Sequence, residues 1–169
     1  MTYEALQRTD FSAGEQPEHL TDQRANLAAW LRYQRHEFLR KLRDLSREQL
    51  VAWSIPPMEL SVLGLVRHMT QMEHGYVIWG IGGGVLTEPY GETDFAGATV
   101  EQVDSDLTRY FEAVEQADAT IAAVASGDTP GAGHGRPLNA VLLKMVHEYT
   151  LHAGQAHMLR FASLGKMKR

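Results

Sequence analysis

The chain has 169 residues, with 16 Lys and Arg against 21 Asp and Glu, and 44% of its residues are hydrophobic. This length and composition indicate one compact domain and exclude a disordered or fibrous protein. The absence of cysteine excludes disulfides, thiolate metal sites and a cysteine nucleophile. Since there is no apolar run of about 20 residues and no signal-peptide pattern, we expect a cytoplasmic protein with no membrane partner.

Residues 1–19 show no sustained periodicity, and we expect them to form an irregular lead-in to a single domain over 20–169. Apolar residues then recur at spacings of three, four and seven, which predicts a helix from about Thr21 to Leu45. Its stripe consists of Leu27, Leu31, Phe38, Leu42 and Leu45. Pro56 and Pro57 prevent the helix from continuing.

The positive charges gather in this first helical segment, where residues 24–47 contain seven bases. Glu37 and Asp44 interrupt them, and the formal net charge of the chain is −5. A nucleic-acid-binding surface is usually a more continuous basic patch on a basic domain. We therefore expect a solvated helix face and no nucleic-acid partner. Trp30 and Leu39, as exposed apolar residues of this helix, would permit a homodimer.

A second helix is predicted after Ser61, which is a suitable N-cap. Its apolar stripe consists of Val62, Leu65, Met69, Met72, Tyr76 and Trp79. The glycine-rich run 80–84 is expected to end this helix, and residues 80–98 to form a loop.

A third helix is predicted after Thr99, because Thr99 and Gln102 have the spacing of a capping box. Its stripe consists of Val103, Leu107, Tyr110, Val114, Ala117, Ile121 and Val124. After a loop over 127–135, Pro137 suits the first turn of a fourth helix. The stripe there consists of Leu138, Val141, Met145, Tyr149, Ala156 and Leu159. Four amphipathic helices without an alternating strand pattern predict an all-α, four-helix bundle.

Three polar residues occupy positions on the inward faces of the second and fourth helices. His68 lies between Leu65 and Met72 on one stripe, and Glu148 and His152 are four residues apart near Met145. Positions four apart on a helix differ by only about 40° around the axis, so Glu148 and His152 project side by side. A buried carboxylate is costly unless it has a partner.

Two imidazoles and a carboxylate in a bundle core predict a divalent metal site at His68, Glu148 and His152. Nitrogen and oxygen ligands suit Zn²⁺, Fe²⁺, Ni²⁺ or Mn²⁺, and three protein ligands leave a position open for water or substrate. Two simpler interpretations stay open. His68 could be a hydrogen-bonded core residue, and Glu148 and His152 could be an ion pair that satisfies itself.

The other histidines do not fit this face. His147 and His157 are five residues from His152, about 140° around the helix, and His74 is six from His68, about 120° away. The run from His147 to His152 resembles a zincin HExxH motif but has one residue too many, so a metalloprotease is excluded. We expect His36 and His19 at the surface.

Three stretches resemble the DinB superfamily, and most of all its branch related to mycothiol-dependent maleylpyruvate isomerases. They are LRYQRHEFLRKLRDLSREQL (31–50), LSVLGLVRHMTQMEHGYVIW (60–79) and VLLKMVHEYTLHAGQAHMLR (141–160). The resemblance implies a DinB-like four-helix bundle. It also implies a divalent metal bound by a histidine of the second helix and a pair four residues apart on the last, here His68, Glu148 and His152.

The resemblance further implies an enzyme that uses a low-molecular-weight thiol such as mycothiol, as an S-transferase or isomerase acting on a small electrophile. We expect zinc, with nickel, iron or manganese as alternatives, to hold the thiolate, and the loop 80–98 to shape the electrophile pocket. The first alternative is a stress-linked protein that binds metal or a small ligand without turnover. The second is a structural bundle whose Glu148 and His152 only satisfy each other. The residues that exchange protons are not identifiable from the sequence.

Overall fold

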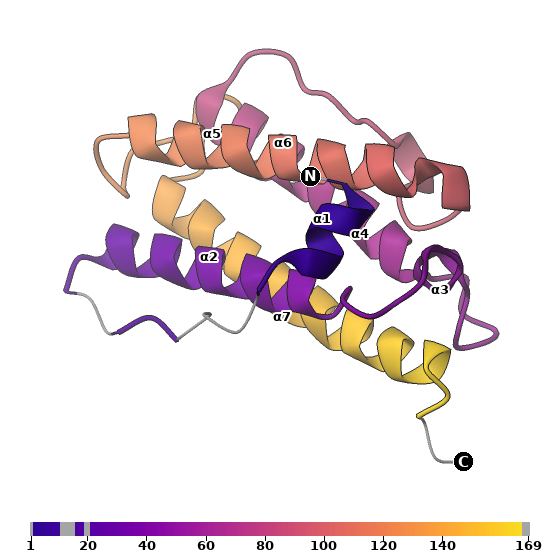
Figure 1. The fold of residues 1–169 in the computed structure, drawn as a ribbon. Coiled ribbons are helices and arrows are strands. Elements are labelled where there is room, and N and C mark those ends of the chain that lie inside the picture. The colour runs from indigo at the N-terminus through magenta and orange to yellow at the C-terminus, as the bar shows by residue number, and fades with distance from the viewer. Residues whose placement is uncertain (1, 11–15, 19–20, 167–169) are drawn as a thin grey trace.

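The computed structural model describes residues 2–10, 16–18 and 21–166. Its four long helical segments lie side by side and enclose one hydrophobic core (Figure 1). They contain α2 (Gln23–Arg40), α4 (Val62–Met72), α6 (Val103–Ala123) and α7 (Leu138–Ser163). The described residues form no β-strand, only an isolated bridge between Pro130 and Pro137. The prediction of an all-α four-helix bundle is confirmed.

The prediction of an irregular lead-in is wrong for its first residues, because α1 (Tyr3–Arg8) is a helix. Its six residues are too few to show periodicity, but Thr2 caps the helix and Leu6 is completely buried. The Tyr3 hydroxyl donates to the carbonyl of Leu45 over 2.9 Å, so a tertiary contact stabilises this short helix. The rest of the predicted lead-in at 1, 11–15 and 19 lies outside the described residues.

The first predicted helix ends earlier than its apolar stripe. Asp22 caps α2 by accepting a hydrogen bond from the backbone N–H of Ala25, and α2 ends at Arg40. Asp44 then takes a left-handed conformation with φ of 60°, which an aspartate tolerates better than most residues. After this turn Ser46 opens α3 (Arg47–Val51) with a capping box that the sequence analysis did not identify.

Leu42 and Leu45 are nevertheless fully buried, so the stripe predicted their burial correctly although they do not continue the helix. Leu39 is only 7% exposed and belongs to the same core as Leu6, so the expectation that it lies at the surface is wrong. One of the two residues offered for a homodimer is therefore not available.

The second predicted helix continues past the glycines that were expected to end it. Ser61 caps α4, as predicted, by accepting from the N–H of Gly64. The helix then widens into a π-helix, η1 (Glu73–Trp79), and closes with α5 (Gly80–Gly82). It ends at Gly83, whose φ of 79° suits a residue without a Cβ.

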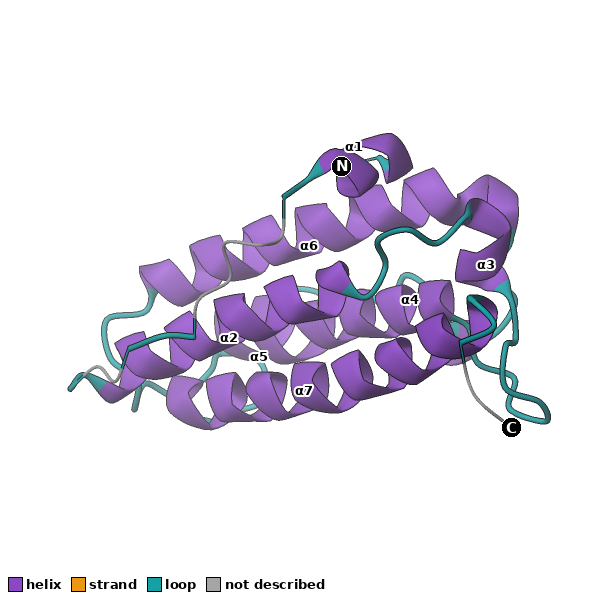
Figure 2. Cartoon of the chain, turned by 60° about the horizontal axis from the view of Figure 1, so that its bottom comes forward, coloured by secondary structure: helices purple, strands orange, loops and turns teal. Residues whose placement is uncertain are grey.

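The remaining elements follow the predicted order. A short 3₁₀ turn, η2 (Gly91–Thr93), lies in the long loop, and η3 (Val100–Gln102) leads into α6. The predicted capping box of Thr99 and Gln102 is present. Seen from a second direction, α2 packs along α7, and α4 with η1 packs against α6 (Figure 2).

Candidate metal centre

His68 of α4 and the pair Glu148 and His152 of α7 meet between the two helices. One ligand atom of each lies within 4.8 Å of the other two. The Glu148 Oε2 atom is 3.3 Å from Nε2 of His152 and 3.9 Å from Nε2 of His68. Glu148 and His152 are buried, and the His68 side chain is 13% exposed. Within the described part of the chain, no other group of three or more possible ligands comes together in this way.

The other ring nitrogen of each histidine is held by an acceptor. Nδ1 of His68 is 2.7 Å from Asp94 Oδ2, and Nδ1 of His152 is 2.7 Å from Gln155 Oε1. Because both contacting atoms are oxygens that accept, Nδ1 donates in each neutral ring and Nε2 carries the lone pair. Such contacts fix the orientation of metal-binding histidines in proteins. Three lone-pair atoms, Nε2, Nε2 and Oε2, therefore face one another.

Lys144 satisfies the opposite side of the carboxylate. Its ammonium donates to Glu148 Oε1 from one turn earlier in α7, which leaves Oε2 directed at the histidines. Burial tends to raise the pKa of Glu148, but the hydrogen bond and charge of Lys144 outweigh it, so this pKa lies below its usual value. Burial lowers the pKa of His152. Both groups therefore favour the deprotonated forms that bind metals.

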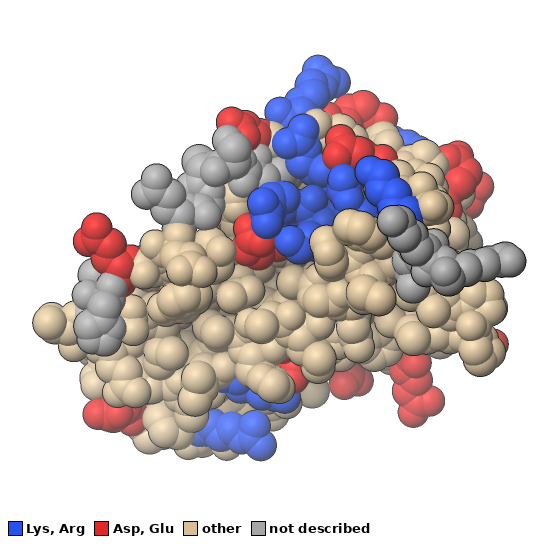
Figure 3. Space-filling view, turned by 90° about the horizontal axis from the view of Figure 1, so that it is seen from below, with Lys and Arg blue, Asp and Glu red and all other residues tan. Residues whose placement is uncertain are grey.

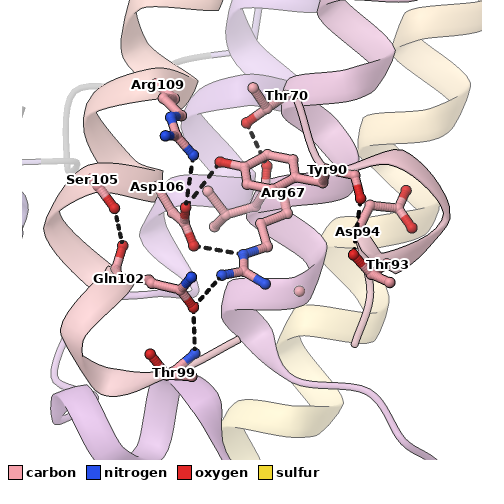
Figure 4. A network of polar contacts seen from close by, with 12 residues as sticks. Arg67, Thr70, Tyr90, Thr93, Asp94, Thr99, Gln102, Ser105, Asp106 and Arg109 are labelled. Atoms are coloured by element: carbon pink, nitrogen blue, oxygen red, sulfur yellow. Dashed lines mark hydrogen bonds and ion pairs between the residues drawn. The ribbon is translucent and has the colours of Figure 1, made fainter. Parts of the chain in front are cut away.

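Asp94 reaches the site because a polar network holds its loop. The Tyr90 hydroxyl donates to Asp106 Oδ1 over 3.0 Å, and Arg67 donates to the same carboxylate (Figure 4). Arg67 also donates to the carbonyl of Ala96. Both Arg67 and Asp106 are at least 95% buried. The two members of this network on the loop, Tyr90 and Ala96, lie on either side of Asp94. The network therefore fixes the carboxylate that orients His68.

The next residue of the same loop also packs against the centre. The Phe95 ring stacks on His68 with ring centroids 4.2 Å apart. A Cβ on Gly64 would overlap the backbone carbonyl of Phe95, so glycine is needed for this close approach. Asp94 and Phe95 thus cover His68 from the side of the long loop.

Two pockets lie near the centre, and one glutamine connects each of them to it. The first, called the polar pocket after its polar side chains Gln71, Thr87, Glu88, His134 and Arg136, has a volume of about 320 Å³ and is also lined by Met72, Tyr76, Trp79 and Leu86. The amide of Gln71 donates to Asp94 over 3.2 Å, which connects this polar pocket to the centre. The loop 80–98 thus lines the polar pocket.

The second pocket has a volume of about 490 Å³ and is lined almost entirely by apolar side chains. Its residues are Ile55, Met58, Leu60, Leu151, Met158 and Leu159, with Gly154 and Gln155. Gln155 is the residue that binds Nδ1 of His152, so this apolar pocket also begins beside the centre.

The histidines set aside in the sequence analysis lie elsewhere. His74 is in contact with Thr87 over 3.2 Å, and His157 packs its ring on Phe161. His147 and His157 are exposed on α7. His36 is partly buried rather than at the surface. His19 lies outside the described residues.

A second buried polar cluster was missed. Arg35 of α2 binds both carboxylate oxygens of Glu73 at 2.8 and 2.7 Å, and the Tyr149 hydroxyl donates to the same carboxylate over 2.6 Å. Glu73 and Tyr149 have no exposed surface. Tyr149 was assigned to the apolar stripe, and Arg35 to a solvated face, because no local spacing connects residues on three different helices. Asp94 and Gln155 were also not assigned, since no pattern in the sequence connects Asp94 to His68.

The comparisons with known proteins agree with the geometry. A family model described as mycothiol-S-transferase matches residues 26–164, which is most of the chain. This confirms the resemblance to the DinB superfamily. No curated protein and no solved structure matches the chain. No helix among the described residues is long and apolar enough to cross a membrane.

Proposed function

Because this chain belongs to the mycothiol S-transferase family, we propose that it transfers a low-molecular-weight thiol to a small electrophile at a divalent metal held by His68, Glu148 and His152. Mycothiol is the thiol that the family description names. The enzyme would act in the cytoplasm on small molecules, without a nucleic-acid or membrane partner.

One observation carries the metal assignment. Three lone-pair atoms converge within 4.8 Å, while hydrogen bonds to Asp94 and Gln155 hold the rest of both imidazoles. Such a convergence is repulsive unless a proton or a cation lies between the atoms. Two nitrogens and one oxygen suit zinc first, and nickel, iron or manganese as alternatives, with a position left open. When bound, the metal would lower the pKa of a coordinated thiol and so supply a thiolate near neutral pH.

The residues around the centre would orient the metal ligands and bind the thiol. Asp94 and Gln155 orient the histidines, and Lys144 holds Glu148 ionised and directed inward. The polar pocket offers groups that bind hydroxyls and two aromatic faces, Tyr76 and Trp79, which suits a hydrophilic thiol. Nearby, Lys144 and Arg136 each lie about 6 Å from the Tyr76 ring.

The test begins with metal analysis of protein purified without a histidine tag. We expect metal in near-unit ratio, removable by a chelator, and a melting temperature that falls on chelation while the bundle stays folded. Mycothiol and an electrophile are then added to the metal-loaded protein, with His152→Ala as the matched control. The proposal is supported if the thiol is consumed with the metal-loaded wild type and not with His152→Ala.

Other results would select one of the alternatives. Bound metal without turnover with any thiol would favour the non-catalytic binding protein. No bound metal under any condition would favour the structural bundle. Complete unfolding on chelation would show that the metal is structural.

A further inference from the structure

The apolar pocket lies beside the candidate metal centre, because Gln155 of its lining holds Nδ1 of His152. Leu151, Gln155 and Met158 follow Glu148 at steps of three, four and three residues, which places them along one face of the helix. Outside α7, the lining consists of Ile55, Met58 and Leu60, from the segment just before α4. Since a helix rises 1.5 Å per residue, the part of α7 that lines the pocket, from Leu151 to Leu159, begins level with His152 and spans about 12 Å.

The lining of this pocket is chemically distinct from that of the polar pocket. Leu151 and Met158 are each 49% exposed, and Met58 is 48% exposed. Gln155 is the one polar side chain of the lining, and its carbonyl oxygen is already used by His152. From below, the side on which α2 and α7 lie in Figure 1, a broad band of the surface carries no Lys, Arg, Asp or Glu (Figure 3). Nothing in the lining would attract an ionic group.

We propose that this apolar pocket binds the aliphatic or aromatic group of the electrophile, while the polar pocket binds the thiol. This inference rests on the proposed function and names its substrate class: uncharged electrophiles with an apolar tail. It moves the electrophile away from the loop 80–98, where the sequence analysis expected it. The volume of about 490 Å³ falls within the range of small-molecule sites, and the reactive carbon would lie at the end beside His152.

An α,β-unsaturated aldehyde is a suitable test substrate. The thiolate sulfur forms a bond to the β-carbon, the π electrons of the C=C bond move towards the carbonyl oxygen, and the α-carbon takes up the proton that the thiol released. The product is a saturated aldehyde that carries a thioether, and no group leaves. The tail of the aldehyde takes no part in these bonds, so its length tests the pocket alone.

The first measurement is binding without metal or thiol, so that it does not depend on catalysis. Unreactive primary alcohols of three, six and nine carbons are titrated by ligand-observed NMR. We expect affinity to rise by up to about fourfold for each methylene that leaves water. The measured quantity is the slope of the logarithm of affinity against chain length. In the double variant Leu151→Asn, Met158→Gln this slope should fall by at least half. Leu143→Asn is the matched control, because Leu143 is 60% exposed on the same helix outside the pocket.

The second measurement is kcat/KM for 2-alkenals of the same lengths with metal-loaded protein and mycothiol. We expect it to rise with length in the wild type and the control, and to lose that dependence in the double variant. Turnover with no dependence on length would overturn the pocket assignment and leave the proposed function standing. Length-dependent binding with no turnover would overturn both. Sedimentation could also show that the wild type is a dimer and the double variant a monomer. That result would overturn the assignment, since a second copy of the chain would then cover the pocket.

Discussion

Two buried polar clusters use consecutive residues of α7 and differ in how their atoms are satisfied. Tyr149 takes part in a closed cluster in which Arg35, Glu73 and the tyrosine hydroxyl pair donors with acceptors. Glu148 takes part in the candidate metal centre, where its Oε2 faces two imidazole nitrogens. Neighbouring positions on a helix differ by about 100°, so one helix presents the two clusters to different neighbours.

The difference teaches how to distinguish a structural cluster from a ligand site when both are buried. In the closed cluster the guanidinium binds both oxygens of Glu73, and no exposed surface of Glu73 remains. At the centre, the acceptors converge and His68 keeps 13% of its side chain exposed. The first arrangement is complete without a ligand, whereas in the second the three atoms that face one another could hold a metal ion.

The largest expected effect comes from breaking the closed cluster. Glu73→Ala would leave the buried Arg35 guanidinium without its bidentate partner, with the half-exposed Asp118, 2.6 Å away, as its remaining carboxylate. Removing one member of a buried pair costs about 3–5 kcal/mol, and we expect the free energy of unfolding in urea to fall by that amount. Glu115→Ala, at an exposed position of α6, is the control and should change it by less than about 0.5 kcal/mol. If Glu73→Ala lowers the free energy of unfolding as little as the control does, the closed cluster does not stabilise the bundle.

Substitutions in the candidate metal centre should instead affect metal affinity. His68→Ala, Glu148→Ala and His152→Ala should each lower it at least about a hundredfold, because changes to the outer partners of such ligands already cost ten- to a hundredfold. The free energy of unfolding of the metal-free protein should change much less than in Glu73→Ala. His74→Ala and His157→Ala are controls that should bind metal normally. The affinities are measured by competition with a chromophoric chelator, and equal values in all five variants would contradict the assignment.

A smaller effect is expected from the residue that only orients a ligand. Asp94→Asn keeps the size of the side chain but replaces the carboxylate that binds Nδ1 of His68. We expect metal affinity to fall about ten- to a hundredfold, while the three ligands remain in place. The same chelator competition measures it. An unchanged affinity would show that Asp94 serves the loop and not the centre.

The smallest effect is the change of metal affinity with pH near neutrality. Burial lowers the pKa of His152 below its ordinary 6.5, so its neutral form persists to a lower pH than in an exposed histidine. Affinity should therefore be nearly constant from pH 8 to about 6.5. At lower pH it should fall by up to about tenfold per unit for each histidine that must release a proton.

Glu148 should add nothing to this profile, because Lys144 outweighs burial and keeps its pKa below the usual value. The metal-free protein should also lose stability as the pH falls below 6.5, since His152 binds a proton less readily when folded than when unfolded. Metal affinity is measured from pH 5 to 8 with a chelator of known pH dependence. A flat profile over that whole range would exclude histidine ligation.

The sequence predicted what depends on local spacing. The helical stripes, the caps at Ser61 and Thr99 and the common face of Glu148 and His152 all follow from contacts three or four residues apart. Lys144 is also four residues from Glu148, so the same spacing rule could have predicted their ion pair. Asp94 is 26 residues from His68, and Arg35 is 38 from Glu73, so these pairs depend on how the elements pack. A six-residue helix such as α1 is likewise fixed by tertiary contacts that no local pattern shows.

The π-helix η1 has a consequence for how this chain can change in length. A π turn holds one more residue than an α turn, so it corresponds to a one-residue insertion that the helix absorbs without breaking. Deleting a single residue there would return the wide turn to an α turn, and the helix before and after it would keep its register. The same deletion within the α-helical turns of Val62–Met72 would rotate everything after it by about 100°. Related chains should therefore gain or lose one residue within 73–79 more readily than within 62–72.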